Sequence, residues 1–103
     1  MTDINDTGKL TPEKAVSIIR EIVQYGDIIP TEHCQKRMNE RHFDMQDIEV
    51  ILKNGNVFEE PEFDEDYESW KYKVEGRSIE GDRGIVVTAI ISHRELLCIT
   101  IMG

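Results

Sequence analysis

The sequence predicts an α+β fold in which N-terminal helices pack on a mainly antiparallel sheet of about four strands. Two observations lead to this prediction. Apolar residues recur at helical spacing before residue 55, whereas beyond residue 56 they alternate with polar residues or run continuously. The helical and strand-like segments are therefore grouped along the chain instead of alternating, which is typical of α+β domains.

The first helix is predicted from a proline that follows a capping hydroxyl. Thr11 supplies the cap and Pro12 occupies the first helical position. Apolar residues then follow at helical spacing: Ala15, Ile18, Ile19, Ile22 and Val23. Gly26 is a suitable C-terminal stop. We therefore expect residues 11–27 to form an amphipathic helix, preceded by a flexible tail over residues 1–10.

Two more helices are predicted after a short edge segment at residues 28–30, where proline limits pairing. Thr31 caps the second helix, which should end near residues 42–43. Asp44 begins the third helix and residues 54–55, Asn-Gly, end it. A DNA-binding helix-turn-helix is the alternative, but the third helix exposes acidic residues and carries almost no side chains that read bases.

The second half of the chain is predicted to form strands. Residues 57–60 form a short strand, and the acidic stretch 58–69 reads as a loop or frayed hairpin. Residues 69–76 alternate cleanly. The unbroken apolar run 85–91 suits a central strand buried on both faces, and residues 96–102 form a last buried strand.

Composition restricts the class of protein. With 103 residues and 39% hydrophobic residues, the chain suits one folded domain, here assigned to residues 28–103 with the first helix as an addition. No apolar stretch approaches the roughly 20 residues of a membrane span, and the polar start is no signal peptide. We therefore expect a cytoplasmic protein. Cys34 and Cys98 lie in apolar patterns and are predicted to be reduced core thiols.

The candidate catalytic residues lie on the second predicted helix. His33, Arg37 and Arg41 are four residues apart and share one helical face. A metal-independent ribonuclease needs a proton acceptor or donor and cations that stabilise a charged phosphorane. Histidine can exchange a proton near neutral pH, and guanidinium groups hold phosphate oxygens bidentately. No cofactor motif or set of metal ligands occurs, so none is expected.

A second group of cations forms the other predicted wall of a groove. Lys71, Lys73 and Arg77 follow one face of the predicted strand 69–76 and are candidate substrate-binding residues. On the other face, Trp70 and Tyr72 are available for stacking on bases, although a core position is the more common use of such a pair.

A structural interpretation competes with the catalytic one. His33 would then bond the backbone near the helix start, while Arg37 and Arg41 would pair with Glu32, Glu40 or the acidic loop. Further along the chain, three residues have weaker claims to the site: His93 in a turn, His42 at a helix end, and Thr100 on the last strand.

The net charge of −9 argues against a simple nucleic-acid binder. Residues 58–69 hold seven acidic groups and no basic group, however, so the rest of the chain carries only −2. Local potential steers binding more than total charge does. The acidic loop is either a solvated connection, a dock for a basic partner, or a mimic of nucleic acid that folds back over the protein's own cations.

Residues of the second and third predicted helices form a recognisable set: His33, Arg37-Met38, Glu40-Arg41, Asp47, Val50, Leu52 and Asn54-Gly55. Segments 72–76, 85–91 and 98–102 continue the pattern. Together, over residues 28–103, they resemble DUF4258, a family of small domains of unknown function. Members of that family resemble the RelE-like and BrnT-like toxins of bacterial type II toxin–antitoxin systems.

This resemblance implies a compact RelE-like fold and an endoribonuclease acting on RNA or at the ribosome, with His33, Arg37 and Arg41 at its centre. It also implies an antitoxin-like protein partner. The alternative function belongs to another class of protein: a non-catalytic interaction module of the same fold, which binds a partner through the acidic loop.

Overall fold

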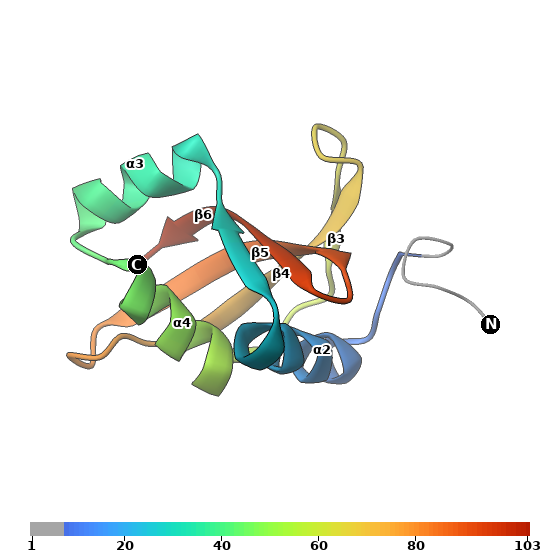
Figure 1. Ribbon diagram of the computed structural model, residues 1–103, viewed down its shortest axis with the longest axis horizontal. Helices are drawn as coiled ribbons and strands as arrows, with labels where there is room; N and C mark the ends of the chain where they lie inside the picture. Colours follow the sequence, from blue (N-terminus) through green and yellow to red (C-terminus); the bar gives the residue numbers. More distant parts are fainter. Residues whose placement is uncertain (1–7) are drawn as a thin grey trace.

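The computed structural model describes residues 8–103 and has an α+β fold with three helices and six strands in that range (Figure 1). The helices are α2 (Pro12–Tyr25), α3 (Glu32–Arg41) and α4 (Met45–Asn54). The strands are β1 (Asp27–Pro30), β2 (Asn56–Val57), β3 (Glu62–Asp64), β4 (Ser69–Arg77), β5 (Arg83–Ser92) and β6 (Glu95–Met102). The predicted fold class is confirmed. Of the predicted tail, residues 1–7 lie outside the described part of the chain.

The strands form one mixed sheet in the order β1-β6-β5-β4-β2, with β3 also paired to β4. Only the β1–β6 pair is parallel, and the other described pairs are antiparallel. The sheet therefore has six strands where about four were predicted. The difference arises at its edges, because β1, β2 and β3 are at most four residues long. The predicted strand 57–60 is replaced by β2 and, within the acidic stretch, β3.

Each helix begins at the residue predicted to cap it. The Thr11 hydroxyl accepts a hydrogen bond from the Lys14 N–H at 3.2 Å, and the Thr31 hydroxyl accepts one from the Cys34 N–H at 3.0 Å. Asp44 forms a reciprocal capping box with the third residue of α4. These bonds satisfy N–H groups that the helix itself leaves unpaired, and so fix where each helix starts.

All three helices contribute buried side chains to one core on one face of the sheet. The helical members are Ala15, Ile19, Ile22, Cys34, Met38, Ile48, Ile51 and Leu52. The strand members are Val57, Tyr72, Val74, Val86, Ile90, Leu96, Cys98 and Ile101. In Figure 1, α2 and α4 lie below the sheet, whereas α3 lies beside the end of β6.

The opposite face of the sheet has no helix packed on it within residues 8–103. We call it the open face, and the strand register assigns its residues, because partners in neighbouring strands point the same way. Its rows are Lys71–Ala89–Leu97–Ile29, Lys73–Val87–Thr100 and Glu75–Ile85–Met102. The prediction that the strand 85–91 is buried on both faces is therefore only partly correct: residues 86–90 are buried, but Ile91 is 38% exposed.

Cys34 and Cys98 are free, buried thiols, as predicted. Burial raises the pKa of Cys34 from its ordinary 9.0 to about 11. Burial, with a smaller contribution from nearby Cys34, raises the pKa of Cys98 to about 12. Both groups therefore stay protonated in the folded protein at pH values where the unfolded chain ionises them.

This difference predicts a loss of stability in alkali. Because the thiol pKa values are higher in the folded protein than in the unfolded chain, their contribution to stability is fully present below about pH 9. It is lost at higher pH, as the thiols of the unfolded chain ionise. We expect each thiol to cost about 1.4 kcal/mol of unfolding free energy at pH 10. Denaturant titrations from pH 7 to 10.5 measure the effect. A Cys34→Ala/Cys98→Ala variant, although less stable throughout, should show a flatter dependence, and an equally steep one would contradict the assignment.

Candidate functional site

Helix α3 is attached directly to the sheet. The Thr31 N–H donates to the Cys98 carbonyl at 3.0 Å, and the Thr31 hydroxyl donates to the Ile99 carbonyl at 2.9 Å. Strand β1 pairs only with residues 95–98 of β6, so α3 takes over as the neighbour of the second half of β6. The chain thus changes from strand to helix at the point where the edge of β6 becomes free.

The three candidate catalytic residues lie on α3, as predicted. Cys34 and Met38 of the same helix point into the core, which leaves His33 and Arg41 exposed and Arg37 half-buried. The Arg37 guanidinium lies 3.6 Å from the Glu40 carboxylate, one of the partners that the structural interpretation named. Arg41 donates to the Gly103 carbonyl at 3.1 Å.

The two arginines differ in how a ligand could reach them. The Arg37 Nε atom has no hydrogen-bond partner among the described residues but is buried, so a ligand could reach only the accessible part of a side chain that is 30% exposed. Arg41 uses one of its five N–H donors on a carbonyl. Within residues 8–103, neither arginine forms an ion pair with the acidic stretch 58–69.

Of the second predicted group of cations, Lys71, Lys73 and Arg77, only the two lysines lie close to each other along the strand. Lys71 and Lys73 are on the open face, in β4, two strands away from β6. Adjacent strands are about 4.8 Å apart, so the lysine-bearing strand lies roughly 10 Å from β6. Arg77 is four residues further along β4, roughly 13 Å from Lys73, and donates to the Gly81 carbonyl at 2.9 Å in the following turn. The structure does not bring Arg77 to the two lysines.

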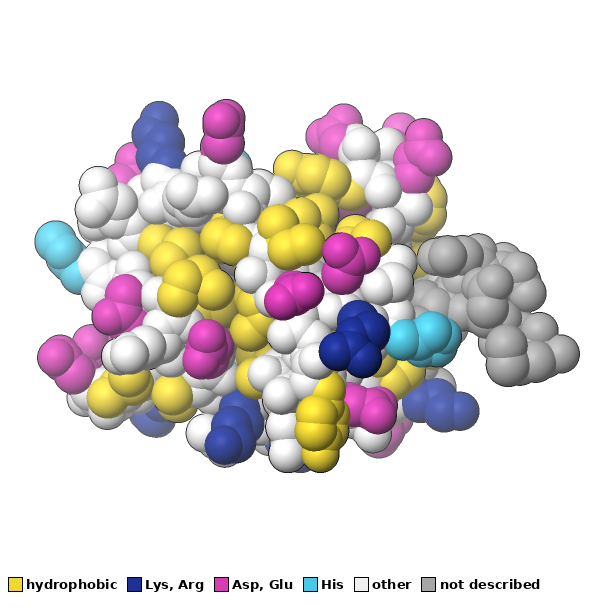
Figure 2. Space-filling view, viewed as in Figure 1, with side chains coloured by type: hydrophobic (Ala, Val, Ile, Leu, Met, Phe, Trp, Pro, Cys, Tyr) yellow, Lys and Arg dark blue, Asp and Glu magenta, His cyan; other side chains and the backbone are white. Residues whose placement is uncertain are grey.

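The acidic stretch neutralises these two lysines, a pairing that the sequence analysis did not assign to particular residues. The Lys71 ammonium lies 3.4 Å from the Asp64 carboxylate, and that of Lys73 lies 3.7 Å from Glu59. Figure 2 shows acidic side chains gathered over the β3 hairpin. These pairings depend on the register of the hairpin, in which Glu62 lies opposite Lys71 and Asp64 lies opposite Ser69, and the sequence pattern did not reveal that register.

Neither aromatic residue of β4 is available to stack on a ligand at the open face. Tyr72 is 1% exposed, and its hydroxyl accepts from the Leu10 N–H at 2.9 Å and donates to the Gly8 carbonyl at 3.2 Å. Burial raises the Tyr72 pKa, against the opposing effect of the Leu10 bond. Trp70 packs edge-to-face on Phe63, with ring centroids 5.3 Å apart. The core interpretation is confirmed for Tyr72.

The secondary candidates occupy separate places. His93 is exposed in the turn between β5 and β6, and His42 closes α3 in a left-handed conformation with φ of 62°. Thr100 is half-buried in the same open-face row as Lys73. Of these three, only Thr100 lies on the face that α3 and the lysines border.

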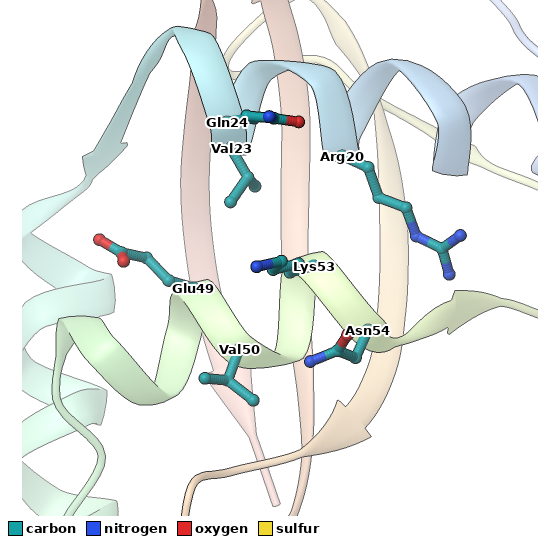
Figure 3. A pocket seen from close by; sticks show the side chains of 7 residues that line it. All are labelled: Arg20, Val23, Gln24, Glu49, Val50, Lys53 and Asn54. Carbon is teal, nitrogen blue, oxygen red and sulfur yellow. The ribbon is translucent and has the colours of Figure 1, made fainter.

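A separate groove of about 560 Å³ runs between α2 and α4 (Figure 3). It is lined by Arg20, Val23, Gln24, Glu49, Val50, Lys53 and Asn54. The Arg20 guanidinium donates to the Gly55 carbonyl at 3.0 Å and so links the two helices. None of the predicted site residues lies there. Among the described residues, no group of three or more His, Cys, Asp or Glu could hold a metal ion.

Comparison with known proteins identifies a family. The family profile described as "Domain of unknown function (DUF4258)" matches residues 30–102, a range that begins after α2. No curated protein and no solved structure matches the chain. In the described part of the chain, no helix is long and apolar enough to cross a membrane.

The Tyr72 hydroxyl is predicted to hold residues 8–10 against the sheet. Tyr72→Phe removes both of its hydrogen bonds and leaves the Leu10 N–H unpaired, so we expect a loss of about 1 kcal/mol of unfolding free energy. Amide hydrogen exchange should accelerate at Leu10. Tyr67→Phe, in the exposed hairpin turn, is the matched control. Unchanged exchange at Leu10 would contradict this role.

Proposed function

We propose that this chain, which belongs to the DUF4258 family, is the toxin of a type II toxin–antitoxin pair and acts as a metal-independent endoribonuclease. One observation carries the proposal: the open face is bordered by α3, with His33 and the two arginines, and by the lysines of β4. RNA would cross this face, with its scissile phosphate beside α3. A RelE-like arrangement and a cytoplasmic location belong to the same proposal.

In this mechanism the exposed His33 imidazole accepts the proton of the 2′-hydroxyl. The 2′-oxygen then bonds to phosphorus, and the bond from phosphorus to the 5′-oxygen breaks. The products are a 2′,3′-cyclic phosphate and a 5′-hydroxyl whose proton comes from water. Arg37 and Arg41 donate hydrogen bonds to the non-bridging oxygens, where negative charge increases in the transition state.

The β4 lysines would bind phosphates of neighbouring nucleotides. Lys71 and Lys73 are partly exposed, with 27% and 34% of their side chains accessible, so a ligand can reach them. Arg77, at the far end of the strand, would contact only a longer RNA. Either free RNA or RNA at the ribosome fits this arrangement, and an antitoxin-like protein would act by covering the same face.

A specific observation favours the second candidate, a non-catalytic interaction module. The middle of the open face is aliphatic: Val87 and Ala89 are buried in it, Leu97 and Met102 are half-buried, and the neighbouring Ile29 is 41% exposed. Aliphatic surface of this kind suits a protein segment better than unstacked bases, which bind to aromatic or guanidinium planes. In this function the acidic stretch 58–69 supplies the contacts with the partner.

The distinguishing experiment is growth of a bacterial host after induction of the chain. Wild type should arrest growth, and His33→Ala and Arg37→Ala should each relieve the arrest, because loss of a general base typically lowers the rate by about 10²–10⁴. His93→Ala, in an exposed turn, is the control for loss of a histidine and should remain toxic.

All variants must be expressed to the same level and show the same circular dichroism spectrum. Unimpaired growth with folded wild type would overturn the toxin proposal in favour of the interaction module. Arrest that persists in His33→Ala would contradict the catalytic role of this histidine.

A further inference from the structure

We propose that residues 58–69, here called the acidic arm, act as a built-in competitor of RNA for Lys71 and Lys73 on the open face. The arm regulates the site described above, so its biological substrate rests on the proposed function. Two ion pairs carry the inference. Asp64 lies 3.4 Å from the Lys71 ammonium, and Glu59 lies 3.7 Å from that of Lys73.

The fold holds the arm against the lysines. Strand β2 pairs with residues 74–75 of β4 and β3 pairs with residues 69–71, both antiparallel. The link at residues 58–61 must therefore pass along β4 beside Lys73. Glu62 faces Lys71 directly in the register, and Asp64 reaches the same lysine along the diagonal. The arm thus places carboxylates along the cationic column of the sheet.

The turn of the arm is ordered by one of the two pairing carboxylates. The Asp64 Oδ1 atom accepts hydrogen bonds from the Asp66 N–H at 2.9 Å and the Tyr67 N–H at 3.2 Å, while Oδ2 faces Lys71. Phe63 packs on Trp70 and fixes β3 from the other side. The Asp64 side chain, which is 14% exposed, is therefore positioned before any ligand arrives.

The competition is reversible because the arm is lightly attached. Strand β3 has three residues, and the Glu59 side chain is 71% exposed. The Glu59–Lys73 pair is therefore weak, whereas the Asp64–Lys71 pair is more shielded, with side chains 14% and 27% exposed. A single phosphate would replace one pair with another, whereas a chain of phosphates can replace both pairs and also bind the arginines of α3. The arm therefore favours polyanions over single phosphate groups.

The experiment compares two double variants of equal net charge. Glu59→Gln/Asp64→Asn removes the pairing carboxylates, and the asparagine oxygen still accepts the two turn hydrogen bonds. Glu65→Gln/Asp66→Asn removes two other carboxylates of the same arm, both from exposed residues. Fluorescence anisotropy measures the affinity of each protein for a labelled 12-nucleotide oligouridylate at 50–200 mM salt.

We expect Glu59→Gln/Asp64→Asn to bind the oligonucleotide about fivefold more tightly than wild type, which is the effect of two partly exposed pairs. Its affinity should also fall more steeply with salt, because unpaired lysines release counterions that paired lysines do not. The control variant should bind like wild type. An equal gain in affinity for both double variants would mean that only the net charge matters, and would overturn the proposal. Absence of oligonucleotide binding by every variant would also overturn it.

A second measurement needs no RNA. Residue-specific acetylation, read by mass spectrometry, should be faster at Lys71 and Lys73 in Glu59→Gln/Asp64→Asn than in wild type, with Lys36 on α3 as the internal reference. Equal acetylation rates of these lysines in the two proteins would contradict their ion pairs with Glu59 and Asp64. The growth experiment with His33→Ala and Arg37→Ala tests the toxin function separately, so failure of one proposal is distinguishable from failure of the other.

Discussion

The packing of the three described helices on one face of the sheet is the constraint on which the rest of the structure depends. Burying one large aliphatic side chain contributes about 1.5–3 kcal/mol, whereas an exposed ion pair contributes about 0–1 kcal/mol. The core under β4, β5 and β6 therefore determines where the helices lie, and the charged residues have little influence on it. Because the described helices share one core, the opposite face of the sheet is left open. The candidate site is consequently a surface bordered by charged elements and not an enclosed pocket.

Strand β6 determines where α3 lies. Its first half pairs with β1, and its second half has α3 as neighbour, with Thr31 bonded to two successive β6 carbonyls where the change occurs. Cys34 and Met38 then fix the rotation of α3 by entering the core. The face of α3 that carries Arg37 and Arg41 is the face that does not enter the core. The orientation of these two arginines therefore follows from the apolar packing of the helix. Ordinary core residues thereby position the groups to which we assign chemistry.

The sequence predicted the features that depend on local chemistry. Helix starts at Thr11, Thr31 and Asp44 were predictable because each cap bonds to a backbone group within three residues, and the alternation of β4 is a local pattern. The short strands β1, β2 and β3 were harder, since their pairing depends on partners distant in sequence. Spacing placed His33, Arg37 and Arg41 on one helix correctly. It could not show that Lys71 and Lys73 are paired with the acidic stretch, because that depends on hairpin register.

The acidic arm also accounts for a conflict between charge and proposed function. A net charge of −9 opposes RNA binding in general, yet seven of the acidic groups lie in one segment of twelve residues. Spread over the surface, the same charges would repel RNA from every direction and at every stage of approach. Placed next to Lys71 and Lys73, two of them act mainly on the lysines that the ligand needs. These two carboxylates therefore compete with the ligand for the lysines. A ligand with several correctly spaced phosphates can displace both of them, whereas a single anionic group cannot.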